Sequence, residues 1–310
     1  MLSDHEPVML NEVLAFLDPQ KDQTFIDCTL GGGGHSKAIL DRIAPAGRLL
    51  AFDWDGTAVE RTVKKLAEYS KRTIIVNQSY TDIKEVAYAN GFNKVNGILL
   101  DLGLSLDQLK NSGRGFSFQL DEPLDMRFST DNGVTAADIL NKYRASELEK
   151  IFFEYGEESQ TRRIVKAIVE YRKEKPILTT LQLVTIVVET KTNNPRVRIH
   201  PATQVFQALR IAVNKELENV QKVLNDSLEL LAPGGKIAVI SFHSLEDRIV
   251  KSFFKLNTKK CICPPELPEC RCEHEATLKI ITKKPISPSQ DEIDKNFRAR
   301  SAKLRVAERI

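Results

Sequence analysis

The chain has 310 residues, of which 42% are hydrophobic and 28% are charged. This length fits two domains of ordinary size or one domain with a large insertion, and the composition is that of a globular protein rather than a disordered one. No apolar run approaches the roughly 18 residues of a membrane-spanning helix, and the N-terminus lacks the basic and apolar regions of a signal peptide. We therefore expect a cytoplasmic protein with no membrane partner.

The net charge of +3 and the isoelectric point near 8.5 are too mild to indicate a nucleic-acid partner by themselves. Positive charge does gather between Lys251 and Ile310, in the segments NTKKC, ITKKP and NFRARSAKLRVAER. A solvated basic face and an RNA-facing patch both explain this distribution, and the sequence leaves the two open.

The first hundred residues alternate between strand-like and helix-like segments. Apolar runs predict strands within residues 24–30, 48–55, 72–80 and 95–103, and helical spacing predicts helices within 35–43 and 56–70. Such an alternation is typical of a parallel sheet in a doubly wound α/β fold.

The pattern changes after Gly103. Glycine and proline interrupt residues 104–134, which predicts a functional loop, and helical signals then run from 135 to 191 with Thr135 and Thr179 or Thr180 as N-caps. One or two long helices follow from 202 and end at Pro233-Gly234-Gly235. A strand within 236–244, a helix within 245–256 and strands within 276–282 and 301–309 complete the chain.

These elements predict a sheet domain interrupted by a helical insertion between its fourth and fifth strands. We place the first part of the sheet domain at residues 1–108, the inserted all-α domain at 109–212, and the second part of the sheet domain at 213–310.

Four consecutive glycines follow the first predicted strand, in the segment IDCTLGGGGHS (residues 26–36). A strand, glycines and a helix start present backbone N–H groups and a helix dipole to a ligand. The dinucleotide fingerprint G-x-G-x-x-G fits poorly, because Ser36 occupies its third position, and no phosphate-binding Gly-Lys-Ser/Thr follows. A tight structural turn also explains four glycines.

An acidic residue, Asp53, ends the second predicted strand. A carboxylate at this place can accept hydrogen bonds from both hydroxyls of a ribose. The glycine turn and Asp53 together indicate a nucleoside ligand without a pyrophosphate, and S-adenosylmethionine is such a ligand. An ordinary turn residue is the alternative.

Two further candidates follow later strands. Asp101 ends the fourth strand at the edge where open α/β sheets bind ligands, although a helix N-cap or turn is an alternative, and Gln108 is close enough along the chain to help close a cofactor pocket. His243 follows the fifth strand and should reach the same edge, where it could contact substrate or serve only for packing and hydrogen bonding.

Four of the five cysteines lie in the segment CICPPELPECRC, as the pairs Cys261/Cys263 and Cys270/Cys272. Paired cysteines in a cytoplasmic protein suggest a metal before a disulfide. However, zinc sites usually have two to four residues within each pair, and here there is one. A zinc knuckle and a plain reduced loop both stay open, so the sequence assigns no metal ligand.

These motifs resemble the RsmH (MraW) family, bacterial methyltransferases that modify the N4 amine of a cytidine in the decoding region of small-subunit 16S rRNA. The resemblance runs through the segments HEPVML, IDCTLGGGGHS, GILLDLGLS, RGFSF, PLDMRF, HPATQVFQALRIAVNKEL, APGGKIAVISFHSLEDRIVK and RARSAKLRVAER. It implies a class I S-adenosylmethionine-dependent methyltransferase fold with an inserted helical domain, and 16S rRNA as the partner. The sequence leaves open whether the substrate is naked rRNA or a small ribosomal subunit particle. The oligomeric state stays open.

The resemblance also implies the cofactor contacts, which fall on Gly33, Gly34, His35, Asp53, Tyr80, Asp101 and Gln108. This chain departs from the commoner family wording at Leu104, Leu106 and Lys110, which affects the shape of the loop after Asp101. The cysteine cluster is not general in the family.

The proposed chemistry needs an acceptor for the protons of a weakly nucleophilic amine. Other amino methyltransferases place Asp/Asn-Pro-Pro-aromatic after the fourth strand, whereas this chain has Asp101-Leu102-Gly103-Leu104. Asp101 and His243 are therefore the candidate catalytic residues. The arginines at positions 114, 127, 196 and 198 and the C-terminal basic residues are candidate phosphate contacts.

Three other classes of function compete. A dinucleotide-dependent oxidoreductase would need the third glycine that is missing, and a DNA-directed amino methyltransferase would need the missing Pro-Pro motif. A noncatalytic nucleic-acid-binding protein on a methyltransferase scaffold is disfavoured by the glycine turn and the acidic residues.

Overall fold

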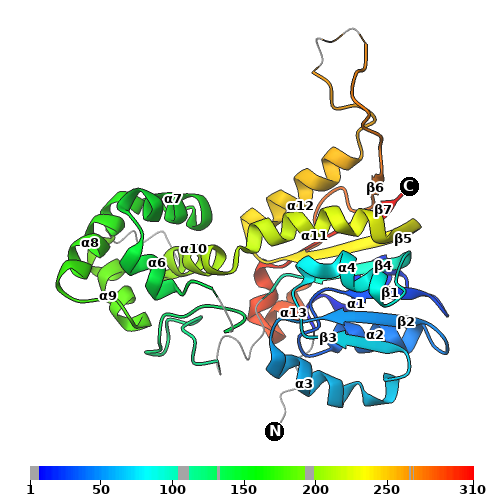
Figure 1. Cartoon of the computed structure of the whole chain (residues 1–310), viewed down its shortest axis with the longest axis horizontal. Coiled ribbons are helices and arrows are strands. Elements are labelled where there is room, and N and C mark those ends of the chain that lie inside the picture. The colour runs from blue at the N-terminus through cyan, green and yellow to red at the C-terminus, as the bar shows by residue number, and fades with distance from the viewer. Residues whose placement is uncertain (1–6, 104–111, 131–132, 193–198, 265–266, 268) are drawn as a thin grey trace. The chain divides into compact units, whose positions relative to one another are not determined.

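In a computed structural model of the chain, the described residues are 7–103, 112–130, 133–192, 199–264, 267 and 269–310 (Figure 1). They divide into two compact units, one formed by Met1–Gly103 with Leu217–Ile310 and the other by Leu104–Glu216. The boundaries that we expected from the sequence were residues 108 and 212. The first unit contains the sheet, and the second is helical.

The described residues of the first unit form a seven-stranded sheet with the order β3-β2-β1-β4-β5-β7-β6. Neighbouring strands from β3 to β5 are parallel, and β7 is antiparallel to both β5 and β6. The expected doubly wound α/β sheet is confirmed. The strands are β1 Thr24–Asp27, β2 Arg48–Phe52, β3 Thr73–Val76, β4 Val95–Asp101, β5 Leu231–Ser241, β6 Leu278–Ile280 and β7 Lys303–Arg309.

Helices cover both faces of the sheet, and alternate strand residues supply the two cores. Ile26 of β1 packs on one face with α4 (Ile83–Ala89), α11 (Glu216–Leu230) and α12 (Ser244–Asn257). Its neighbour Phe25 packs on the opposite face with α1 (Leu10–Leu17), α2 (Gly34–Arg42) and η3 (Phe297–Ser301). The remaining elements of this unit are α3 Gly56–Lys65, η1 Ala67–Tyr69, η2 Tyr80–Asp82 and α13 Gln290–Lys295.

The parallel strands place their carboxyl ends at one edge of the sheet, and each strand is followed there by a residue considered in the sequence analysis. The predicted strands were too long at this edge, because β1 ends at Asp27, β2 at Phe52 and β5 at Ser241. Beyond these residues the chain leaves the hydrogen-bonded sheet and forms the turns that lead into the next helices.

The end of α11 also differs from the prediction. We expected the helix to run to Pro233, but it ends at Leu230 and β5 begins at Leu231. A residue before proline is disfavoured in the helical conformation, so the chain becomes extended ahead of Pro233. The two long helices of this region are separate, as α10 (Thr203–Asn214) and α11.

The second unit has its own hydrophobic core, formed by α6 Ala136–Lys142, α7 Ala145–Gly156, α8 Thr161–Glu174, α9 Thr180–Thr190 and α10. Helices α7 and α10 approach closely at Gly156, where a Cβ atom would lie 2.7 Å from the carbonyl oxygen of Gln204. The predicted N-caps are confirmed at Thr135, which has a capping box with Asp138, and at Thr179.

None of the helices in the described part of the chain is both long and apolar enough to cross a membrane.

Candidate active site

The turn between β1 and α2 presents bare backbone at the carboxyl edge of the sheet. Gly31 and Gly33 have positive φ angles of 48° and 71°, which glycine adopts without strain. A Cβ atom on Gly33 would lie 2.5 Å from Cγ2 of Thr62, whereas one on Gly32 would meet nothing within 4 Å. The turn therefore needs glycine at residue 33 for packing, and it leaves the exposed residue 32 open to a ligand.

Helix α3 holds this turn in place. Oγ1 of Thr62 donates to the carbonyl of Gly31 at 2.8 Å, and Nζ of Lys65 donates to the carbonyl of Gly32 at 2.9 Å. Gly33 is the N-cap of α2 and has no side chain to cap the helix. The start of α2 can therefore offer backbone N–H groups and the positive end of its dipole to a ligand.

Asp53, directly after β2, is joined to the turn. Its Oδ2 accepts a hydrogen bond from the N–H of Gly31 at 2.7 Å, and its Oδ1 accepts one from the N–H of Asp55 at 2.9 Å. Burial raises the pKa of Asp53 to about 6, although these N–H groups lower it. The carboxylate is thus fixed at the strand end, and each oxygen keeps a further lone pair for a hydroxyl group.

Asp101, the last residue of β4, is joined to the same turn from the other side. Its N–H donates to Oγ1 of Thr29 at 2.7 Å. Burial raises the pKa of the Asp101 carboxyl to about 6, although His35 and the N–H of Gly103 lower it. Its Oδ1 is buried and has no hydrogen-bond partner among the described residues. A buried acceptor without a donor is costly, so this atom is suited to a ligand or substrate donor.

His35 connects the N-terminal segment to this site. Its ring is buried, with Nε2 3.0 Å from the carbonyl of Val8 and Nδ1 4.0 Å from Oδ2 of Asp101. Burial lowers the pKa of His35, although Asp101 and the Val8 carbonyl raise it. A neutral ring would donate from Nε2 to Val8 and leave Nδ1 as an acceptor facing Asp101.

A third carboxylate lies beneath the turn. Asp27 is 1% exposed and accepts hydrogen bonds from Oγ of Ser36 at 2.6 Å and from the N–H of Thr29 at 3.0 Å. Burial raises the pKa of Asp27, although both hydrogen bonds lower it, and its negative charge in turn raises the pKa values of Asp53 and Asp101. Asp27 therefore fixes both ends of the turn from below.

Two aromatic rings lie against each other in the segments that follow β2 and β3. Trp54 follows Asp53 in the chain, and its ring lies 6.4 Å from that of Tyr80, with 22° between the planes. Tyr80 begins η2, four residues after the end of β3, whereas the predicted strand extended to residue 80. These two rings, one directly after β2 and one in the segment that follows β3, provide an apolar surface that suits a planar base.

His243 lies after β5, at the predicted edge, and its geometry is that of a helix cap. Its Nδ1 accepts a hydrogen bond from the N–H of Glu246 at 3.5 Å, and its Nε2 lies 3.0 Å from Oε1 of Glu246. Oε2 of Glu246 in return accepts from the N–H of His243 at 3.3 Å, and it also accepts from the N–H of Phe242 at 2.9 Å. This capping box fixes the start of α12.

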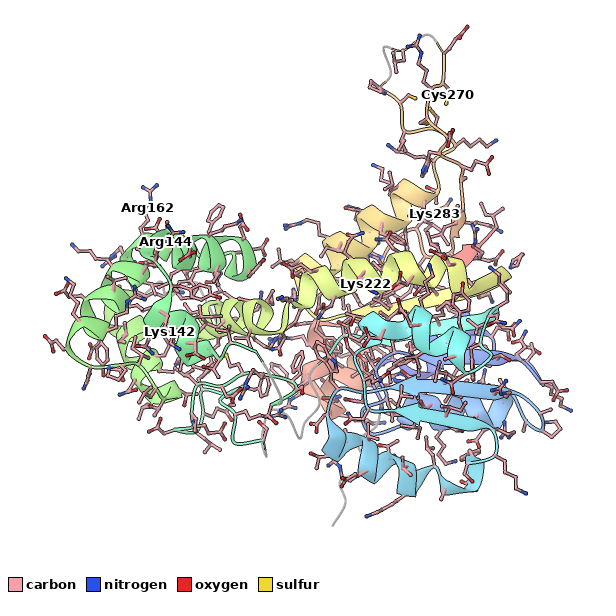
Figure 2. All side chains as sticks on the ribbon, viewed as in Figure 1. Lys142, Arg144, Arg162, Lys222, Cys270 and Lys283 are labelled. Carbon is pink, nitrogen blue, oxygen red and sulfur yellow. The ribbon has the colours of Figure 1, made fainter. Side chains whose placement is uncertain are left out.

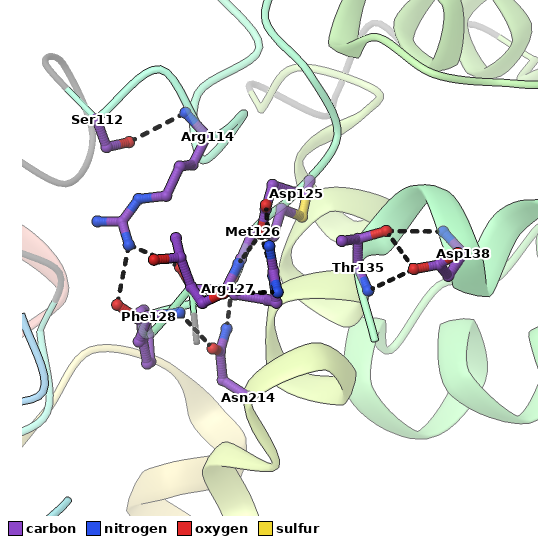
Figure 3. Close-up of polar contacts among 10 residues, drawn as sticks. Ser112, Arg114, Asp125, Met126, Arg127, Phe128, Thr135, Asp138 and Asn214 are labelled. Carbon is purple, nitrogen blue, oxygen red and sulfur yellow. Dashed lines mark hydrogen bonds and ion pairs between the residues drawn. The ribbon is translucent and has the colours of Figure 1, made fainter. Parts of the chain in front are cut away.

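Other predicted contacts are placed differently or lie outside the described residues. In the helical unit, Arg114 donates to the carbonyls of Arg127 and Phe128, each at 2.9 Å, and Arg127 forms a two-bond pair with Asp125 (Figure 3). These two side chains hold their own loop rather than project freely. Residues 108, 196 and 198 lie outside the part of the chain that the structure describes.

The residues present fit S-adenosylmethionine on these observations. Asp53 offers acceptors for ribose hydroxyls, Gly32 offers backbone that a ligand can approach, and Asp101 has an unpartnered oxygen. The third glycine of a pyrophosphate-binding turn is replaced here by Ser36.

The fold and the site define the class. A sheet of order 3-2-1-4-5-7-6 with an antiparallel seventh strand is the class I fold of S-adenosylmethionine-dependent methyltransferases, and the chain is such an enzyme. The sequence profile described as the MraW methylase family matches residues 2–310. The chain therefore belongs to the MraW methylase family.

Similar proteins with curated names cover nearly the whole chain. A protein of Thermomicrobium roseum named ribosomal RNA small subunit methyltransferase H is 50% identical over 306 residues, which are 99% of this chain and 94% of that protein. Proteins of the same name from Caldicellulosiruptor bescii and Clostridioides difficile are 48% and 46% identical, each over 99% of both chains.

Sequence reasoning missed several residues that shape the site. Thr29, which joins the glycine turn to β4, lies between Asp27 and the glycines but resembles any strand-end threonine. Ser36 was considered only as a misfit to a dinucleotide motif, yet it binds Asp27. Trp54 is the one tryptophan of the chain and directly follows Asp53, which was a signal that could have been used.

Proposed function

We propose that this protein transfers a methyl group from S-adenosylmethionine to the N4 amine of a cytidine in the decoding region of small-subunit 16S rRNA. The observation that carries the proposal is the glycine turn joined to Asp53 on one side and to Asp101 on the other, in a chain of the MraW methylase family. The names of its relatives support small-subunit rRNA as the substrate.

The cofactor site is assigned to residues of the sheet unit. Asp53 accepts the ribose hydroxyls, and the backbone around Gly33, Gly34 and His35 contacts the cofactor's polar groups. Trp54 and Tyr80, whose rings lie 6.4 Å apart, contact the base. Gln108 keeps the role that the family resemblance implies.

Catalysis rests on alignment and on an acceptor for the amine protons. S-adenosylmethionine supplies an electrophilic methyl group when bound. A cytidine amine is a poor nucleophile because its lone pair is delocalised into the ring, so the enzyme must hold nitrogen in line with the methyl group. Oδ1 of Asp101 is the acceptor we assign, because it is buried and has no partner among the described residues. Its pKa of about 6 leaves it ionised at neutral pH and able to accept a proton.

His243 is the weaker catalytic candidate. Its Nδ1 accepts a hydrogen bond within the capping box, and its buried Nε2, which has no hydrogen-bond partner among the described residues, lies 3.0 Å from the carboxylate of Glu246 rather than open to a substrate. We assign it to positioning the turn between β5 and α12, which lies next to the end of β4.

The helical unit is proposed to recognise rRNA, and the target cytidine must leave any base stack to reach the site. An irregular, single-stranded rRNA segment reduces the cost of that step. Such a reaction takes place in the cytoplasm, on rRNA or on a small-subunit particle. Arg114 and Arg127 of the helical unit are engaged within their own loop. Exposed cations such as Arg300, in η3 of the sheet unit, are therefore better candidates for phosphate contacts.

The proposal is tested in a strain that lacks this protein. Mass spectrometry of its small-subunit rRNA should show loss of N4-methylation at one cytidine. The wild-type gene and an Asp294→Ala control, which removes an exposed carboxylate of α13, should restore it, and Asp53→Ala should not. Unchanged modification in the deletion strain, or restoration by Asp53→Ala, would contradict the proposal.

A further inference from the structure

The segment between α12 and β6, residues 258–277, forms an arm that carries four cysteines. Figure 1 shows it extending beyond the end of α12, away from the sheet, and Figure 2 shows Cys270 near its outer part. Neither a helix nor a strand occurs in the described residues of the arm. Ile262 and Leu267 are 46% and 40% exposed, so the arm buries little apolar surface of its own.

The base of the arm is held by hydrogen bonds. The N–H of Thr277 donates to the carbonyl of Asn257 at 2.8 Å, and its Oγ1 donates to Oδ1 of the same residue at 3.1 Å. Arg309 of β7 donates to the carbonyl of Thr277 at 2.8 Å. These bonds fix the two ends of the arm on the sheet unit, but they do not reach its tip.

At the tip the four cysteine sulfurs converge. All four Sγ atoms lie within 4.8 Å of one another. Sγ of Cys261 lies 3.4 Å from that of Cys270 and 3.6 Å from that of Cys272, and the last two are 3.6 Å apart. Four sulfurs at the corners of a tetrahedron around zinc, each about 2.3 Å from the ion, are about 3.8 Å apart. The observed separations are close to that value and far from the roughly 2.05 Å of a disulfide.

Backbone N–H groups also point at these sulfurs. The N–H of Ile262 donates to Sγ of Cys272 at 3.4 Å, and the N–H of Arg271 donates to Sγ of Cys263 at 3.3 Å. Donors of this kind stabilise thiolates, which are the form that binds metal. Exposed cations of the arm, Lys259 and Lys260 among them, offset the negative charge of four thiolates.

We propose that Cys261, Cys263, Cys270 and Cys272 bind one zinc ion through four thiolates, and that this ion holds the tip of the arm folded. The sequence left a zinc knuckle and a reduced loop open because each pair encloses a single residue. The convergence of all four sulfurs favours the zinc site, because the arm has exposed apolar residues and only a few N–H···S hydrogen bonds to keep four thiols together. The site is structural, because four protein ligands leave no open position for substrate.

The test uses the full chain, without a polyhistidine tag, purified under reducing conditions. Elemental analysis should find about one zinc per chain in the wild type and in Glu273→Ser, a matched exposed substitution within the arm. The variant with all four cysteines of the arm changed to serine should contain none. Replacement of the metal by Co²⁺ in the wild type should give the intense visible absorption of a tetrahedral site and a thiolate charge-transfer band.

A second readout follows the arm itself. Trypsin should cleave at Arg271 slowly in the metal-loaded wild type and rapidly after chelation or in the serine variant. The inference is overturned if the wild type holds no more zinc than the serine variant, if it holds iron instead, or if chelation leaves the cleavage rate unchanged. Should the serine variant fail to fold, the Co²⁺ spectrum and the chelation experiment on the wild type still decide.

Discussion

At the scale of single residues, the two strand-end carboxylates differ in how they are satisfied. Both oxygens of Asp53 accept backbone N–H groups, whereas Oδ1 of Asp101 has no partner among the described residues. A fixed carboxylate suits recognition of a ribose, and an unsatisfied one suits a transient proton or hydrogen bond. This difference supports the proposed binding role of Asp53 and the proposed catalytic role of Asp101.

The glycine turn gives a paired prediction. Gly33→Ala should lower the free energy of unfolding by roughly 1–3 kcal/mol, because φ is +71° and the new Cβ would lie 2.5 Å from Thr62. Gly32→Ala should leave stability near that of the wild type, since its Cβ meets nothing within 4 Å.

Gly32→Ala, which should keep its stability, should instead lose affinity for the cofactor. Gly32→Ala should weaken S-adenosylmethionine binding by about tenfold or more in calorimetric titration, because the methyl group occupies the space through which the ligand approaches. Wild-type affinity in Gly32→Ala would show that the ligand does not approach the turn there.

Asp101→Asn should lower methyl transfer and should change how stability depends on pH. The carboxyl pKa is raised from 3.8 to about 6 by burial, so the folded state binds more protons than the unfolded state between these values. Wild-type stability contributed by this group therefore falls as pH rises through that window. The stability of Asp101→Asn relative to wild type, measured as the difference in free energy of unfolding, should therefore be greater at pH 8 than at pH 5 by about 1 kcal/mol.

Urea unfolding at the two pH values measures this difference, and methyl transfer by Asp101→Asn should fall by about a hundredfold. A difference in unfolding free energy that does not change with pH, together with unimpaired transfer, would contradict the role given to Asp101.

At the scale of elements, local sequence and tertiary packing agree well. Oγ1 of Thr135 caps α6 by accepting a hydrogen bond from the N–H of Asp138 at 3.0 Å. Oδ2 of Asp138 in turn accepts one from the N–H of Thr135 at 3.1 Å. Thr135→Ala should lower the stability of the helical unit by about 1 kcal/mol, as seen by hydrogen exchange in α6. Thr185→Ala, an exposed change within α9, is the control and should have a smaller effect. Equal effects would argue against the cap.

Much of the fold and part of the site could be predicted from the sequence. The alternation of strand-like and helix-like segments predicted the doubly wound sheet, and Phe25 and Ile26 do face its two cores. The positions of Asp53 and Asp101 follow because parallel strands end at one edge. Thr29 and Ser36 could not be predicted, because their roles depend on which carboxylate tertiary packing brings near them. The convergence of the arm cysteines is likewise a property of the folded loop.

At the scale of the whole molecule, the two units have separate cores, and we propose that the sheet unit binds the cofactor. S-adenosylmethionine at about 100 times its dissociation constant should stabilise the sheet unit by about 2.7 kcal/mol. Hydrogen exchange should show slower opening of β1, β2 and β4, with little change in the core helices α7 and α10. NAD at the same concentration is the control and should protect neither unit; protection by NAD would favour a dinucleotide enzyme.

The central claim is that the glycine turn and the two carboxylates bind the adenosyl moiety at the carboxyl edge of the sheet. A crystal structure of the chain with S-adenosylmethionine tests it most directly. We predict ribose hydroxyls within hydrogen-bond distance of Asp53 and the ligand lying against Gly32. A ligand bound elsewhere, with Asp53 still bonded only to Gly31 and Asp55, would contradict the account.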